Sequence, residues 1–341
     1  MSTSFTYRFL VLFAVLLLCL GLNISLGSVN IPFKATIQHL FLSGNPDDSW
    51  YYIIWNYRIP KAVTAILVGS GLSLSGLLMQ TLFRNPLAGP FVLGISSGAS
   101  LGAAFLIMGG GIISAWLGIR FISDVSLAIA ASFGSFMVLL AVIGMARKVK
   151  DTMALLIIGL MFGSITAALV TVLSYFAQAE ELQQYIYWSF GTVGNLNWSQ
   201  VGLLGLITVI GLLLSIYSIK SLNALLLGEN YAQSMGVKIR KSRYLIIIAT
   251  GILAGSVTAF AGPIAFLGLA VPHLTRQIFN TTDHKILVPG VVLYGAILLL
   301  ICDTIAQLPS SSYVLPINAI TSVIGAPVII WLLVRKRKMI F

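Results

Sequence analysis

The chain has 341 residues, of which 58% are hydrophobic and only 9% are charged. Soluble proteins carry about a quarter charged residues, so this composition excludes a soluble globular protein and indicates a polytopic membrane protein. The net charge of +11 does not indicate nucleic-acid binding, because the basic residues lie in short gaps between apolar runs, where they orient membrane helices.

The apolar runs predict ten membrane-spanning helices, because most approach the ~20 residues that a helix needs to cross a bilayer. The predicted spans are 8–27, 60–82, 91–111, 125–145, 153–176, 201–219, 244–262, 264–279, 286–306 and 316–334. The first is read as a helix rather than a signal peptide, because no small-residue cleavage site follows it. We therefore predict one all-α transmembrane domain over 1–341.

An even number of spans places both termini on the same side of the membrane. That side receives 16 of the 20 lysines and arginines, and the other side receives Lys34, Arg58, Lys61 and Arg120. The positive-inside rule therefore predicts that both termini are cytoplasmic.

The longest polar interruption, 220–243, lies between the sixth and seventh spans and is predicted to be cytoplasmic. Within it, Leu227, Tyr231 and Met235 recur every four residues, which predicts a short helix with one apolar face. Glu229 falls in the first turn, where a carboxylate suits the helix dipole. The apolar face could dock another protein or could pack on its own bundle, and the residues alone favour the second alternative.

The turn after the second span begins with Arg84, Asn85 and Pro86, a combination that ends a helix and starts a turn. The glycines that follow, Gly94 and Gly98, lack the lysine of a phosphate-binding loop, and that loop pattern is found nowhere in the chain. Any ATP would therefore be hydrolysed by a partner.

The two cysteines, Cys19 and Cys302, lie in separate apolar runs and predict no disulfide framework. The histidines show no zinc-binding spacing, so no metal site is predicted. Pro272 should bend or shorten the eighth span, and His273 with Arg276 should hydrogen-bond near its cytoplasmic end.

Asp303 is the one acid placed well inside a span, where a carboxylate is costly and often functional. Its structural alternative is a hydrogen-bonded group near the outer end of the ninth span. Arg58 and Lys61 open the second span on the outer side, where they could meet lipid headgroups or the acids of an external partner. Composition does not separate these alternatives.

Several stretches together resemble the FecCD-type permeases of ABC importers, which take up iron chelates, heme and cobalamin. The resemblance covers nearly the whole chain and rests on RNPLAGPFVLGISSGAS (84–100), WSFGTVGNLNW (188–198), LLLGENYAQSMGV (225–237) and GPIAFLGLAVPHLTR (262–276). It implies the type II importer permease fold, with ten helices per subunit and two copies side by side in the bacterial cytoplasmic (inner) membrane. It also implies two ATPase subunits, which carry the ATP and magnesium, and an external binding protein.

The family motifs assign roles residue by residue. The resemblance implies that the coupling helix for the ATPase comprises Leu227, Gly228, Glu229, Tyr231, Ala232, Gln233, Ser234, Met235 and Gly236. It places binding-protein docking at Arg58 and Lys61, with Arg120 as a further candidate. It places the path at the fifth and tenth spans, where we name Gly163, Ser164, Thr166 and Thr171, and an outer gate at Trp188 and Gly191. The remaining motif residues, expected to be structural, are Arg84, Asn85, Pro86, Gly94, Gly98, Pro272, His273, Arg276 and Asp303.

Three positions depart from the family pattern. Gln307 stands where an arginine is usual, Val314 stands where a glutamate is usual, and Asn318 replaces a glycine. The missing arginine weakens one docking expectation. The alternative function is a secondary transporter driven by an ion gradient, which should depend on Asp303. An enzyme is not predicted, because no paired acid and base or metal set is found.

Overall fold

The computed structural model describes residues 3–27, 29, 31–41, 48–109, 123–149, 151–309, 311 and 313–334. Every regular element within these residues is a helix. The helices are α1 (Thr3–Ser25), α2 (Phe33–Phe41), α3 (Ser49–Ile53), α4 (Ile59–Leu82), α5 (Ile95–Met108), α7 (Asp124–Lys148), α8 (Thr152–Phe176), α9 (Ala179–Ser189), α10 (Trp198–Tyr217), α11 (Ile219–Leu226), α12 (Glu229–Ser234), α13 (Ile239–Ala261), α14 (Leu267–Phe279), α15 (His284–Ala306) and α16 (Ile317–Val334), with a π-helical turn at Ile54–Arg58 and a 3-10 turn at Pro90–Leu93.

Each of the ten predicted spans overlaps with one of these helices. Among the described residues, seven helical stretches are long and apolar enough to cross a membrane by themselves. They contain α1, α4, α7, α8, α10, α13 and α15. Two shorter apolar helices, α5 and α16, and the 13-residue α14 account for the other three predicted spans. The all-helical polytopic fold is thus confirmed, and α5 with 14 residues and α14 with 13 residues are shorter than a full crossing.

The second span begins earlier than its sequence predicts. Helical structure runs without a break from Ser49 to Leu82, although Pro60 lies within it. Proline removes a backbone donor, and its ring clashes with the carbonyl four residues earlier. The π-helical turn at Ile54–Arg58 widens the backbone just before this proline, and the Ile59 N–H donates to the Ile54 carbonyl five residues back.

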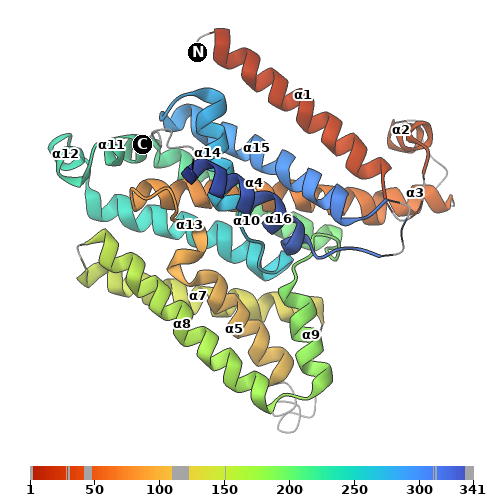
Figure 1. Cartoon of the computed structure of the whole chain (residues 1–341), viewed down its shortest axis with the longest axis horizontal. Helices are drawn as coiled ribbons and strands as arrows, with labels where there is room; N and C mark the ends of the chain where they lie inside the picture. The colour runs from red at the N-terminus through yellow and green to blue at the C-terminus, as the bar shows by residue number, and fades with distance from the viewer. Residues whose placement is uncertain are drawn as a thin grey trace.

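The helices form two groups that lie side by side (Figure 1). One group contains α1, α4, α14, α15 and α16, and the other contains α5, α7, α8 and α9. Helix α13 contacts both α4 and α7 and therefore joins the two groups. The most buried helix is α4, whose residues from Val68 to Leu82 are all shielded from solvent.

Glycines bring helix backbones into direct contact at several places. A Cβ atom added to Gly69 would lie 2.3 Å from the Gly295 carbonyl oxygen, which joins α4 to α15. The same test at Gly98 on α5 gives 2.6 Å to the Gly134 oxygen on α7. Membrane helices associate through such close approach, because lipid provides no hydrophobic drive between them.

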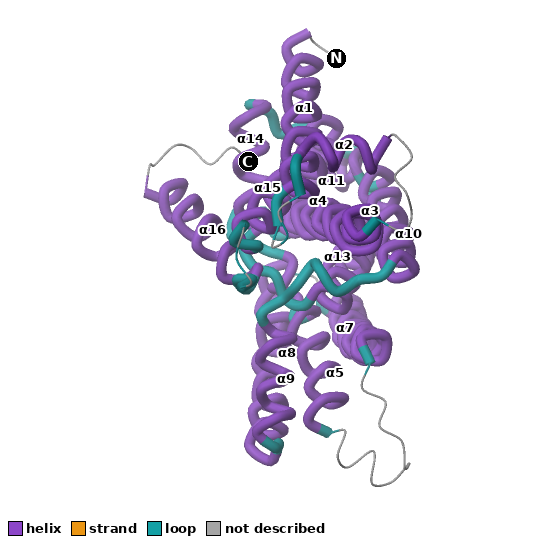
Figure 2. Tube along the Cα trace, turned by 90° about the vertical axis from the view of Figure 1, so that its right-hand side faces the viewer, coloured by secondary structure: helices purple, strands orange, loops and turns teal. Residues whose placement is uncertain are grey.

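The described helices also agree with the predicted orientation. The beginning of α1, the end of α16, and helices α11 and α12 lie at one end of the bundle (Figure 1). Helices α2, α3 and α9 lie at the opposite end, which faces the viewer in Figure 2. The bias of lysine and arginine assigns the first of these ends to the cytoplasm.

Candidate functional site

The short helix α12 projects from the cytoplasmic end of the bundle (Figure 1). Glycines with positive φ flank it, at +104° for Gly228 and +83° for Gly236. A residue with a Cβ atom rarely adopts this left-handed region, so glycine is required where the chain turns into and out of the helix. The two glycines therefore fix the angle at which α12 leaves the membrane domain.

The apolar face of α12 points away from the rest of the chain. Leu227, Tyr231 and Met235 are between 58% and 60% exposed, whereas Ala232 on the opposite face is fully buried. Gln233 and Ser234 are also exposed. The face therefore does not pack on its own bundle, contrary to the alternative that the residues alone favoured. It forms an uncovered apolar surface at the cytoplasmic end.

An ion pair anchors the base of α12 to the membrane helices. The Glu229 carboxylate lies 2.9 Å from Nη2 of Arg243 on α13, whose side chain is 7% exposed. Nη1 of Arg243 donates to the Val149 carbonyl at 3.1 Å, and Thr152 on α8 lies 3.5 Å from Glu229. Glu229 therefore holds α12 against both α8 and α13, in addition to its place at the helix N-terminus.

Two cavities open beside α12. One, of about 590 Å³, lies between the end of α7, α12 and the start of α13, and Glu229, Gln233, Gly236 and Arg243 are among its lining residues. The other, of about 650 Å³, is lined by Arg84, Thr152 and residues 227–231 and 234. Both cavities leave the sides of α12 accessible, so a partner protein could contact this helix on either side.

The turn that begins the 84–100 stretch, together with the preceding end of α4, contacts α14 through hydrogen bonds. The His273 ring lies with Nε2 3.0 Å from the Pro86 carbonyl oxygen, and Arg276 donates from Nη1 to the Gln80 side chain at 2.7 Å. Asn85 shapes the turn itself, since its Oδ1 accepts from the Leu87 N–H at 2.9 Å. These contacts confirm that His273 and Arg276 hydrogen-bond near the cytoplasmic end. Pro272 lies inside α14, which is short as predicted.

The glycines of the same stretch serve packing. Gly94 has φ +71°, and a Cβ atom there would lie 2.8 Å from the Gly159 oxygen on α8. Together with the contact between Gly98 and Gly134, it sets α5 closely against α7 and α8. No phosphate-binding role is needed to explain either glycine.

Arg58 and Lys61 do not form a free docking surface in this structure. Arg58 is 8% exposed, and its guanidinium donates to the carbonyls of Ile24 and Ser25 at the end of α1 and to the Val29 carbonyl beyond it. Helix ends leave four carbonyls without intrahelical partners, so Arg58 acts here as the cap of α1. A docking role would require it to leave these carbonyls. Arg120 lies outside the described residues.

Lys61 likewise forms an ion pair within the chain. Its Nζ lies 3.2 Å from Asp303 on α15, whose side chain is 4% exposed. Asp303 also accepts from Asn23 at 2.9 Å and from Gln307 at 2.7 Å. This carboxylate is thus a fully bonded group near the outer end of its span, as its structural alternative predicted. Gln307, which replaces the family's usual arginine, still reaches Asp303.

The four path residues lie on different faces of α8. Thr166 is buried and hydrogen-bonds within the helix, Gly163 is half-buried, and Ser164 and Thr171 are exposed. The exposed face also carries Ile157, Leu160, Met161, Ile165, Leu169 and Val172. Within one copy of the chain, α8 therefore presents a mostly apolar face with two hydroxyls. Of the four named residues, Ser164 and Thr171 are the two whose side chains are exposed.

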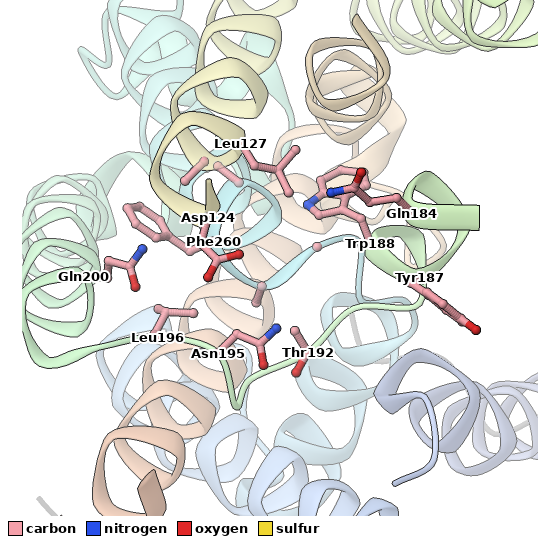
Figure 3. A pocket seen from close by; sticks show the side chains of 14 residues that line it. Asp124, Leu127, Gln184, Tyr187, Trp188, Thr192, Asn195, Leu196, Gln200 and Phe260 are labelled. Carbon is pink, nitrogen blue, oxygen red and sulfur yellow. The ribbon is translucent and has the colours of Figure 1, made fainter. Parts of the chain in front are cut away.

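Trp188 lies at the outer end, where the last turn of α9 packs near the end of α13 (Figure 3). Trp188 lines a cavity of about 230 Å³ together with Asp124 and Leu127 of α7, Gln184 and Tyr187 of α9, and Thr192, Asn195, Leu196 and Gln200 beyond it. Gly191 has φ +73°, and the Thr192 N–H donates to the Ala261 carbonyl at 2.8 Å. The chain between α9 and α10 is therefore attached to the turn that joins α13 to α14.

Sequence reasoning missed a second polar cluster at the cytoplasmic end. Asn223 of α11 bonds to Asp283 and His284 at the start of α15, and His284 contacts Thr81 of α4. Burial alone would raise the pKa of Asp283, but hydrogen bonds from the Lys285 N–H and Asn223, together with the Lys285 charge, lower it. Asp283 is therefore a carboxylate at neutral pH. In the sequence, this cluster is indicated only by the two adjacent polar residues Asp283 and His284, which directly precede an apolar run.

Comparisons with known proteins agree with this arrangement. The FecCD transport family model matches residues 14–335. The BtuC proteins of Salmonella typhi and Salmonella newport (strain SL254), vitamin B12 import system permeases, are each 39% identical over 287 residues, which is 84% of either chain. A solved metal-chelate type ABC transporter in an inward-facing conformation is 27% identical, with a TM-score of 0.82 over 98% of this chain and 100% of its own.

A second solved structure, PsaBC from Streptococcus pneumoniae in complex with Fab, has a TM-score of 0.54 at 16% identity over 88% of this chain and 94% of its own, and it supports the fold alone. The family match extends from within α1 to the end of α16 and includes α12, the turn at 84–90 and α14. The chain therefore belongs to the FecCD transport family, whose members are the membrane-spanning permease subunits of transporters.

Proposed function

We propose that the chain is the translocation subunit of an ABC importer for cobalamin or a metal chelate, with iron-siderophore and heme included in that class. Two copies would form the path between them, two separate cytoplasmic ATPases would drive alternating access, and an external binding protein would deliver the substrate. The observation that carries the proposal is α12, whose exposed apolar face and two accessible sides fit a coupling helix seated in a groove on an ATPase.

The pairing of Asp303 argues against an ion-driven secondary transporter. A carrier of protons or sodium needs an acid that can exchange its cation during transport. Here the carboxylate is bonded to Lys61, Asn23 and Gln307, and it lies near the outer end of α15 rather than at the membrane midplane. It stabilises the contact of α1, α4 and α15.

Reconstitution into proteoliposomes tests the power source. With the ATPase and binding protein present, we expect substrate uptake that requires ATP and survives an ionophore. Uptake that persists without the ATPase and collapses with the ionophore would contradict the proposal. The substrate is tested separately, by measuring whether the cognate binding protein retains cyanocobalamin, heme or a ferric siderophore.

The ion pair at the base of α12 provides a prediction about coupling. Glu229→Lys places two cations together at a site where Arg243 is buried, and it leaves the Arg243 guanidinium without its carboxylate partner. We expect uptake per ATP hydrolysed to fall about tenfold or more. The exchanged pair Glu229→Arg with Arg243→Glu restores the attraction and should recover much of the loss. Normal uptake by Glu229→Lys would show that α12 is not the coupling element.

Gly236 gives a second test of α12 that involves no charge. A Cβ atom at Gly236 meets nothing within 4 Å, so Gly236→Ala creates no clash and acts only through the φ of +83° at this position. The bundle should remain folded while the exit angle of α12 changes. We expect lowered uptake per ATP at an unchanged unfolding temperature, and an unchanged ratio would contradict this role.

A further inference from the structure

The coupling loop is attached to the membrane domain at two separate places. The first is the pair of Glu229 with Arg243, which connects α12 to α13. The second lies one helix earlier, where Asn223 of α11 reaches the start of α15. The second attachment is not explained by the docking of an ATPase on α12, because Asn223 lies on α11 and faces into the membrane domain rather than toward the exposed face.

Asn223 makes three hydrogen bonds across this contact. Its Nδ2 donates to Asp283 at 2.7 Å, and its Oδ1 accepts from the His284 backbone N–H at 2.9 Å. The same Oδ1 lies 2.7 Å from Nδ1 of the His284 ring. Because a carbonyl oxygen can only accept, Nδ1 carries a proton here. Both polar atoms of the Asn223 amide are thus bonded at the start of α15, Nδ2 to the N-cap residue Asp283 and Oδ1 to the first helical residue, His284.

The His284 ring continues the contact into α4. His284 is fully buried, and its Nε2 lies 2.8 Å from the hydroxyl of Thr81. Thr81 lies in the last turn of α4. Asn223, His284 and Thr81 therefore form a chain of side chains from the coupling loop to two membrane helices, and we call these three residues the α11 bridge.

Helices α4 and α15 also contact each other at several points along their length. Their backbones touch where Gly69 meets Gly295, and the pair of Lys61 with Asp303 closes their outer ends at 3.2 Å. The cytoplasmic ends are joined by Thr81 and His284. A displacement applied at one end of this pair is therefore carried to the outer end, because neither helix can slide without breaking a buried contact.

We propose that Asn223 is a positioning residue that transmits movement of the coupling loop to the α4–α15 pair. The inference rests on the proposed function, since the movement comes from the ATPases. If α11 shifts, it must either break three partly buried hydrogen bonds, one of them to the ring of the fully buried His284, or draw the start of α15 with it. Unpaired buried polar groups are costly, so the second course is favoured. The α11 bridge thus acts in parallel with Glu229 and drives a different group of helices.

The decisive variant is Asn223→Leu, studied in proteoliposomes with the full chain, its ATPase and its binding protein. Leucine matches the size of asparagine but removes all three hydrogen bonds. We expect ATP hydrolysis to remain while uptake per ATP falls about tenfold, within the range found for residues that carry coupling. Thr81→Val, which removes the hydroxyl at the far end of the α11 bridge, should lower the same ratio by a smaller factor.

Two controls separate positioning from stability. Asn197→Leu makes the same substitution at the N-cap of α10 on the outer side, where Asn197 accepts from the Gln200 N–H, and should lower the unfolding temperature without changing uptake per ATP. The exchanged pair Asn223→Asp with Asp283→Asn keeps a donor and acceptors between the two positions. It should restore the ratio that Asn223→Leu loses.

The inference is overturned if Asn223→Leu and Thr81→Val leave uptake per ATP at the wild-type value, whatever their unfolding temperatures. It is also overturned if Asn197→Leu lowers the ratio as much as Asn223→Leu. Failure of the proposed function gives a different result, namely wild-type uptake that does not require the ATPase.

Discussion

Gly76→Ala is expected to destabilise the protein by at least about 3 kcal/mol, the upper part of the range for an overpacked core, and to remove most of the folded yield. A Cβ atom at Gly76 would lie 1.9 Å from the carbonyl oxygen of Gly268 and 2.5 Å from its Cα atom. These are backbone atoms, so no side-chain rotation can relieve the contact. Helices α4 and α14 would have to separate along a buried interface.

The start of α14 cannot move away easily, because Gly268 is enclosed from another direction. A Cβ atom on Gly268 would lie 2.6 Å from Cδ of Pro90 and 2.9 Å from the Leu72 oxygen. Gly144→Ala on α7 is the matched control, since a Cβ atom there meets nothing within 4 Å. It should be neutral or stabilising by up to about 1 kcal/mol, as alanine favours a helix over glycine.

The comparison uses the unfolding temperature and the monodisperse yield of both variants in the same detergent. Equal values for Gly76→Ala and Gly144→Ala would show that α4 and α14 do not touch through their backbones. A third variant, Gly69→Ala, should behave like Gly76→Ala, because it faces the Gly295 oxygen at 2.3 Å.

Asp303→Ala is expected to cost about 3 kcal/mol, because loss of one member of a buried ion pair leaves the other without compensation. Lys61 would remain 19% exposed without its carboxylate, and Gln307 would lose the acceptor at 2.7 Å. Asn23 would keep its contact with Thr304 at 3.0 Å, which limits the damage on the side of α1. The unfolding temperature measures the effect.

The double variant Lys61→Met with Asp303→Leu separates a structural acid from a transporting one. Replacement of both charges by apolar groups of similar size is often neutral, so much of the stability should return. If Asp303 only joins helices, ATP-driven uptake should return with it. A double variant that folds as well as wild type but fails to transport would reveal a direct role for Asp303.

The sequence alone determined the class of protein, its ten hydrophobic segments, their orientation and the cytoplasmic loop at 220–243. These properties follow from local quantities. The length of an apolar run is set by the bilayer, and the side of a loop is set by its lysines and arginines. The apolar period of Leu227, Tyr231 and Met235 likewise predicted α12, whose bounds the structure gives as Glu229–Ser234.

Only the tertiary structure decided which helix faces are buried and which polar groups pair with one another. Leu227 could have been buried or exposed with the same sequence around it, and Lys61 could have pointed outward rather than toward Asp303, 242 positions later. The contacts between Gly76 and Gly268 and between Asn223 and His284 also join distant segments. These contacts depend on the free energy gained when polar groups pair and helix backbones pack closely across the bundle. No single segment of the sequence determines that free energy.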